Sequence, residues 1–180
     1  MNFEELDEKT RAYMLSEFEA EEANGNPYRS ERLTAAGLAA FPDIMRQAIK
    51  TGSVESMLHA LQNQQYWNQT ETYVRDGITR TKKINQQQAA EQLSLSEFNT
   101  WYVRGLTKRL LDEGVQSCQA YRGAQPKWEP GDCVAHEGQI YSVEVIYSGH
   151  RAKYWPKPGN LDAISIPFGP GCHHTIRRMK

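Results

Sequence analysis

Cysteine and histidine side chains gather in two short segments near the end of the 180-residue chain. Cys133 and His136 have the spacing C-x-x-H, and Cys172, His173 and His174 follow after an interval of 35 residues. Thiolate sulfur and imidazole nitrogen are the ligands that a structural zinc ion prefers, and a tetrahedral site needs two short-range pairs that folding brings together. Cys172 with either following histidine could supply the second pair. We predict a structural zinc site formed by Cys133, His136, Cys172 and His174.

The same side chains could instead carry catalysis. Cys172 beside two histidines could be an activated thiol, and His136 with Glu137 could act as a base and an acid. Side chains that are neighbours in the sequence need not face each other, however, and no third group that would orient them can be identified. A metal- or cysteine-dependent enzyme is therefore the weaker alternative. The interpretation without any function for these residues is that the cysteines are buried and free and the histidines are solvated.

The segments that must position these ligands lie after Gly114, where helical periodicity stops and glycine, proline, tryptophan and tyrosine become frequent. Residues 139–147 are dense in β-branched and aromatic side chains that alternate between two faces, which predicts a strand. Two further strands are predicted at 152–155 and 163–166, with turns between the strands. A unit of this size has a small core, so a bound metal ion would add stability that it otherwise lacks.

The preceding residues indicate helices. Within 96–113, after an N-cap serine and before a glycine, apolar residues recur at four-residue spacing, which predicts the strongest helix. These residues are Phe98, Tyr102, Leu106 and Leu110. Residues 62–84 are polar and predict a partly exposed connection. The patterns together predict an α+β protein, with a helical region at 1–115 followed by a small β-containing unit at 116–180 that zinc would staple.

Basic residues in two places could contact nucleic acid. Residues 86–109 are similar in pattern to a helix-turn-helix module, in which the small Ala90 would let two helices cross and Ser96 would cap the recognition helix. Thr100 is polar at a position that such a module buries. The side chains that would meet phosphates are Arg104, Lys108 and Arg109 in this helix, and Arg177, Arg178 and Lys180 at the end of the chain. A DNA-binding regulator is therefore the second hypothesis.

Charge is balanced over the whole chain but not along it. Lysine and arginine number 21 against 22 for aspartate and glutamate, so bulk charge predicts neither a nucleic-acid nor a membrane partner. Residues 1–24 carry eight acids and two bases, whereas residues 150–180 carry six bases and one acid. This asymmetry predicts docking of the two ends on each other, two different partners, or simply two solvated faces.

The sequence also bears on membranes and on the redox compartment. No apolar run approaches the length of a membrane-spanning helix, and the acidic first residues lack the apolar core of a secretory signal, so we expect neither. Three cysteines are an odd number in such a chain. They favour a reduced compartment, with thiols or metal ligands rather than a disulfide framework.

The C-terminal half of the chain resembles a known family in the order of its motifs. A helix containing Ser96 and Glu97 comes first, then the segment 132–138 with its C-x-x-H turn, then a strand, and last the segment 169–174. This order is similar to the C-terminal domain of the Mu-type minor capsid proteins, which act in head morphogenesis of tailed phages. Those proteins have a Thr-Glu pair in the helix and a final Cys-Arg-Cys or Cys-Arg-His, where this chain has Ser-Glu and Cys-His-His.

The resemblance implies a non-enzymatic structural or assembly protein of a phage or prophage head. The partners it implies are other phage structural proteins, the portal or the capsid, within an oligomeric assembly. It leaves room for contact with packaged DNA and implies no membrane. The expected location is the virion or the bacterial host cytoplasm.

Overall fold

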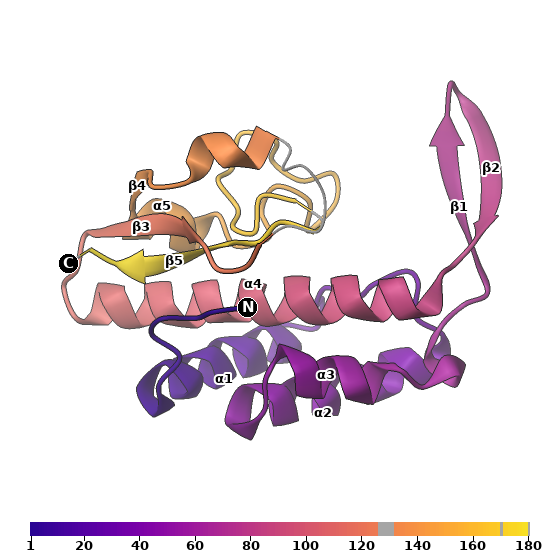
Figure 1. Cartoon of the computed structure of the whole chain (residues 1–180), viewed down its shortest axis with the longest axis horizontal. Helices are drawn as coiled ribbons and strands as arrows, with labels where there is room; N and C mark the ends of the chain where they lie inside the picture. Colours follow the sequence, from indigo (N-terminus) through magenta and orange to yellow (C-terminus); the bar gives the residue numbers. More distant parts are fainter. Residues whose placement is uncertain (126–131, 170, 180) are drawn as a thin grey trace. The chain divides into compact units, whose positions relative to one another are not determined.

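The computed structural model describes residues 1–125, 132–169 and 171–179 (Figure 1). Its helices and small sheets give the α+β class that the sequence predicts. The chain forms two compact units, which we call the terminal unit (Met1–Tyr28 with Ser96–Lys180) and the hairpin unit (Arg29–Leu95). The predicted boundary at residue 115 differs from this division, because the first 28 residues and the whole of the helix predicted at 96–113 belong with the C-terminal third.

The hairpin unit begins with two helices whose first turns are capped. The Thr34 side chain accepts a hydrogen bond from the backbone N–H of Gly37, and Ser53 and Ser56 form a reciprocal capping box. The elements of this unit are α2 (Ala35–Thr51), α3 (Val54–Leu61), η1 (Gln64–Tyr66), β1 (Thr70–Arg75), β2 (Ile78–Lys83) and the first part of α4 (Gln86–Asp112). Its buried apolar side chains include Phe41, Met45, Ile49, Met57, Leu61 and Trp67.

Strands β1 and β2 form an antiparallel hairpin within the segment predicted as a polar, partly exposed connection; its exposure is confirmed, but its strands were not predicted. Asp76 and Gly77 at the turn have φ values of 55° and 74°. Two consecutive positive φ values are typical of a type I′ turn, for which Asp-Gly is a favoured pair. Nearly all side chains of the two strands are exposed. A ribbon that buries neither face has the polar composition of a loop, so no hydrophobic alternation indicates its strands.

The terminal unit is built around the second part of α4, which Figure 1 shows between a three-stranded antiparallel sheet and helix α1. Phe18 of α1 meets Trp101 of α4 edge-on, with ring centroids 5.2 Å apart. The side-chain amide of Asn99 donates to the backbone oxygen of His174 at 2.8 Å, which fixes the sheet on the helix. The elements are α1 (Glu8–Ala23), β3 (Ser117–Arg122), η2 (Asp132–His136), β4 (Ile140–Ser142), α5 (Val143–Ser148) and β5 (His174–Arg178), with sheet order β4-β3-β5.

The predicted strand at 139–147 was largely wrong. Only β4 is extended, and the chain continues as helix α5. Val143 and Ile146, three residues apart, are buried, whereas Val145 is 42% exposed. The residues therefore follow helical spacing rather than strand alternation. The segments predicted as strands at 152–155 and 163–166 form turns and irregular structure, and the strands that pair are β3 and β5 instead.

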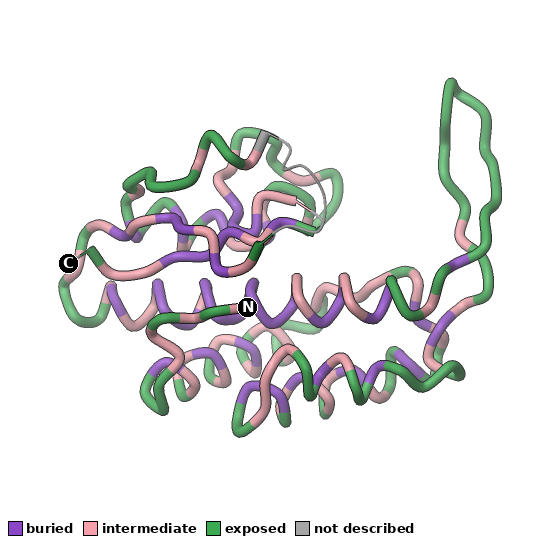
Figure 2. Tube along the Cα trace, viewed as in Figure 1, coloured by how far each residue is buried: buried purple, intermediate pink, exposed green. Residues whose placement is uncertain are grey.

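The helix predicted at 96–113 is confirmed as the second part of α4. Its four predicted apolar residues are fully buried, and Gly114 with φ 73° follows the helix. Figure 2 shows the buried positions recurring along this helix. A Cβ atom on Gly105 would lie 2.5 Å from the backbone nitrogen of Met14, so glycine allows α1 its close approach to α4. In the described part of the chain, no helix combines the length and apolar character needed to span a bilayer.

The acidic start of the chain is docked on its basic end within the terminal unit. Glu4 pairs with the Arg177 guanidinium at 2.6 Å. Glu5 accepts a hydrogen bond from the backbone N–H of Arg178 at 2.5 Å. Of the three explanations offered for the charge asymmetry, intramolecular docking is therefore the one that the structure shows.

Glu113 lies in the middle of this charge cluster and should make folding stability depend on acid pH. Hydrogen bonds from Lys9, Arg178 and Arg109 lower its pKa from 4.5 to about 2. A carboxylate whose pKa falls on folding contributes stability above its unfolded pKa and loses that contribution as the pH falls through its folded pKa. We expect the free energy of unfolding to decline from about pH 5 toward pH 2. In Glu113→Gln this decline should be shallower. Urea unfolding at stepped pH measures both proteins, and superimposable pH profiles would contradict the expectation.

Candidate metal centre

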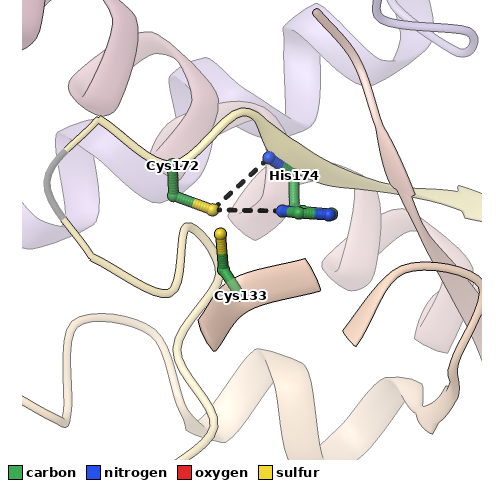
Figure 3. A group of neighbouring side chains, drawn as sticks. All are labelled: Cys133, Cys172 and His174. Atoms are coloured by element: carbon green, nitrogen blue, oxygen red, sulfur yellow. Dashed lines mark hydrogen bonds between the residues drawn. The ribbon is translucent and has the colours of Figure 1, made fainter. Parts of the chain in front are cut away.

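Three of the four predicted zinc ligands lie together. Among the described residues, Cys133, Cys172 and His174 form a group whose ligand atoms all lie within 4.8 Å of one another (Figure 3). Cys172 and His174 are buried, and Cys133 is partly exposed. Figure 3 shows the Cys133 sulfur turned toward the Cys172 sulfur. The C-x-x-H turn therefore lies against the C-terminal tail, as the sequence predicts.

Strand β3 brings the two segments together because it contacts both. On one side it pairs with β5, so that Arg122 lies opposite His174. On the other side, Ala120 binds the turn that follows Cys133. The Ala120 N–H donates to the Gln139 carbonyl, and the Gly138 N–H donates to the Ala120 carbonyl, both at 2.9 Å.

Backbone geometry places Cys172 and His174 on the same side of the chain. The loop turns at Gly171, where φ is 74°, and β5 begins at His174. His174, and not the adjacent His173, is the histidine that the structure groups with Cys172. The His174 backbone N–H donates to the Cys172 sulfur at 3.4 Å, and His174 Nδ1 lies 3.5 Å from that sulfur. The structure therefore brings to Cys172 the histidine that the predicted ligand set contains.

The separation of Cys172 and His174 fits a tetrahedral zinc ion, and all three ligand atoms lie within 4.8 Å of one another. Zinc–sulfur bonds of about 2.3 Å and zinc–nitrogen bonds of about 2.0 Å separate tetrahedral ligand atoms by about 3.5–3.8 Å. The 3.5 Å between Cys172 Sγ and His174 Nδ1 matches this separation. All three cysteines of the chain are free thiols, so none is committed to a disulfide.

Burial shifts the pKa values of two members of this group, Cys172 and His174, in the metal-free protein. Burial raises the pKa of the Cys172 thiol, and backbone hydrogen bonds from His174 and Phe168 oppose the rise. Burial also lowers the pKa of His174, and the nearby Arg122 charge lowers it further. A neutral imidazole has a lone pair ready for a metal. A catalytic thiol needs a lowered pKa, so these surroundings give no support to a cysteine nucleophile.

His136, the fourth predicted ligand, faces elsewhere in this arrangement. Its Nδ1 lies 2.6 Å from the Tyr141 hydroxyl, within hydrogen-bond distance. Its ring stacks on Phe168 with centroids 3.9 Å apart, and the Phe168 ring is in turn 6.1 Å from the ring of His174. His136 therefore lies beside the three-residue group and not within it, and its role as a ligand stays a prediction.

The basic residues predicted to contact nucleic acid are engaged with carboxylates. Five of the six form ion pairs within the terminal unit, and Lys180 lies outside the described residues. The pairs are Arg104–Glu17, Lys108–Asp112, Arg109–Asp7, Arg109–Glu113, Arg177–Glu4, Arg178–Glu5 and Arg178–Glu113. A phosphate would have to displace these carboxylates. DNA binding by these residues stays a prediction.

The turn expected of a helix-turn-helix at 86–109 is not there. Helix α4 runs from Gln86 to Asp112 through the predicted turn at Ser94–Ser96. The hydroxyl of Ser94 donates to the Glu91 carbonyl within the helix, so a serine that favours caps is accommodated without a break. The expectation of two crossing helices in this segment was wrong.

Sequence reasoning missed a buried ion pair in the terminal unit. The Arg151 guanidinium donates to both carboxylate oxygens of Glu97, at 2.9 and 2.7 Å, and the two side chains are 2% and 3% exposed. The guanidinium also lies over the rings of Tyr28 and Trp101. The partners are 54 residues apart in the sequence. No local pattern links such residues, so no sequence signal could have revealed the pair.

Known proteins give no further guide to the site. The sequence matches no protein-family model, and comparisons with curated proteins and with solved structures give no match either. The functional conclusion therefore rests on the residues and the geometry described above.

Proposed function

We propose that this chain is a non-enzymatic structural or assembly protein of a phage or prophage head, and that zinc bound by Cys133, Cys172 and His174 closes its C-terminal third. The observation that carries the proposal is the contact between the C-x-x-H turn and the C-terminal tail. These are the two most specific segments of the resemblance to Mu-type minor capsid proteins. Their contact is what both the zinc site and the resemblance require.

The zinc ion would act as a cross-link between two segments of a small unit. Thiolate and imidazole ligands bind zinc tightly only when folding has brought them together. The free energy of zinc binding would therefore stabilise the folded state. His136 belongs to the same η2 segment as Cys133 and stays the predicted fourth ligand. The glutamate of the Ser-Glu motif, Glu97, is buried in the ion pair with Arg151, which supports a structural role for that motif as well.

The partners that we propose are the portal or capsid proteins of the same particle, in an oligomeric assembly in the virion or in the host cytoplasm. The exposed hairpin β1–β2 supports an assembly role. Val74 and Ile78 near its tip are 70% and 57% exposed. A two-stranded hairpin alone is only marginally stable in water, so contact with a partner would stabilise this ribbon.

The assembly role is tested by following the protein into particles. Particles from the phage or induced prophage that encodes the chain are purified by density gradient, treated with nuclease, washed in high salt and quantified by mass spectrometry. We expect a constant ratio of this protein to the major capsid protein through every step. Removal of the protein with the nuclease and salt washes would favour a DNA-bound regulator, and its absence from particles at all stages would overturn the assembly role.

A further inference from the structure

The buried imidazole of His174 has one nitrogen that the metal-free structure leaves without a hydrogen bond. Nδ1 faces the Cys172 sulfur at 3.5 Å. Nε2 is buried, and the described residues offer it no hydrogen-bond partner. The side chain is only 2% exposed, so the imidazole is shielded from bulk solvent. Buried polar atoms of native proteins are nearly always hydrogen-bonded, and each exception needs an explanation.

The group that faces this nitrogen is the carboxylate of Glu137. Glu137 Oε2 lies 3.7 Å from His174 Nε2, just beyond hydrogen-bond length. The same oxygen accepts hydrogen bonds from Arg122 Nε at 3.0 Å and Nη2 at 2.7 Å. Arg122 is also the cross-strand partner of His174 in the β3–β5 ladder. The sheet therefore fixes both the histidine and the arginine that holds the carboxylate.

We propose that Glu137 is a positioning residue for the metal centre: it accepts the Nε2–H of His174 and thereby directs Nδ1 to the metal. The proposal rests on the zinc site proposed above. Metal-binding histidines almost always donate their other ring N–H to a carboxylate, a carbonyl or a water, which fixes the ring and its tautomer. The Glu137 carboxylate, His174 Nε2 and His174 Nδ1 lie in the order that this arrangement, which we call the relay, requires. Arg122 completes it by holding Glu137 in place.

The relay also explains the residue types in the turn after the C-x-x-H motif. Glu137 follows His136 directly, and the backbone N–H of Gly138, whose φ is 79°, then donates a hydrogen bond to Ala120 of β3. The turn therefore delivers a ligand, Cys133, and a supporting carboxylate from one short segment. Without the relay, the pair of Arg122 and Glu137 would be an ordinary ion pair at the surface, where Glu137 is 44% exposed.

The test compares Glu137→Gln with Glu144→Gln, an identical chemical change at an exposed glutamate of α5. Zinc affinity is measured by competition with a chelating dye, and the tautomer of His174 by long-range ¹H–¹⁵N NMR of the zinc-loaded protein. We expect zinc bound through Nδ1 with the proton on Nε2 in the unaltered protein. Glu137→Gln should weaken zinc binding about 10- to 100-fold, and Glu144→Gln should leave it unchanged.

The outcomes separate the relay from the site on which it rests. Zinc binding that is equal in all three proteins would overturn the relay and leave the metal site intact. Ligation through Nε2 in the unaltered protein would overturn the relay without any variant. Failure of the unaltered protein to bind zinc would overturn the site itself. Melting of the metal-free proteins serves as the folding control, and we expect Glu137→Gln and Glu144→Gln to melt alike in that state.

Discussion

Replacing Arg151 with alanine is expected to destabilise the protein by about 3–5 kcal/mol, because it leaves the buried carboxylate of Glu97 without its counter-charge. The two side chains are 2% and 3% exposed and share two hydrogen bonds. Solvent therefore cannot replace the lost partner. Glu97 lies on α4 and Arg151 in the segment after α5, so loss of the pair should loosen that segment from the helix.

Chemical denaturation of matched variants measures this effect. Lys153→Ala removes an exposed base from the same segment and should change the unfolding free energy by no more than about 0.5 kcal/mol. The double variant Glu97→Leu with Arg151→Met removes both charges and should recover most of the stability that Arg151→Ala loses. A loss in Arg151→Ala no larger than that of Lys153→Ala would mean that the pair is solvated and not buried.

Removing zinc is the second change with a large expected effect. At free zinc 1,000-fold above the dissociation constant, binding to the folded state adds about 4 kcal/mol. For a chain of this length that corresponds to a Tm difference of about 8–16 °C between the zinc-loaded and the chelator-treated protein. Cys172→Ser should melt near the chelator-treated value whether or not zinc is added, because the site has lost a thiolate.

A buried cysteine outside the group provides the control for this experiment. Cys118 is buried in β3, and burial raises the pKa of its thiol to about 12. Cys118→Ala should lower the Tm through lost packing, but the shift between zinc and chelator should stay that of the unaltered protein. A chelator that leaves the Tm of the unaltered protein unchanged would contradict the zinc staple.

The parts of the fold that the sequence predicts correctly depend on local repetition or on ligand chemistry. Helix 96–113 follows from a four-residue spacing of large apolar side chains, and all of them face the core. The meeting of Cys133 with Cys172 and His174 could be predicted because the ligand chemistry itself requires two segments to converge. Neither inference needs knowledge of distant contacts.

The parts that failed depend on which surfaces the rest of the chain covers. Residues 143–148 have β-branched side chains typical of a strand, but they form α5 because the buried pair Val143 and Ile146 is three residues apart. The hairpin β1–β2 buries almost nothing, so no hydrophobic alternation marks it. The relay of Arg122, Glu137 and His174 joins two strands and a turn through the β3–β5 register, and that register cannot be read from local sequence.

Native mass spectrometry of the freshly purified protein tests the central claim most directly, since it counts the metal ions held by each folded chain. The protein is purified without added metal or chelator, and a second spectrum is recorded after acid denaturation of the same sample. The mass difference between the two spectra identifies the bound metal. We predict one zinc ion per chain in the folded state, lost on denaturation and absent from Cys172→Ser. A folded chain that carries no metal, even after incubation with zinc, would contradict the account.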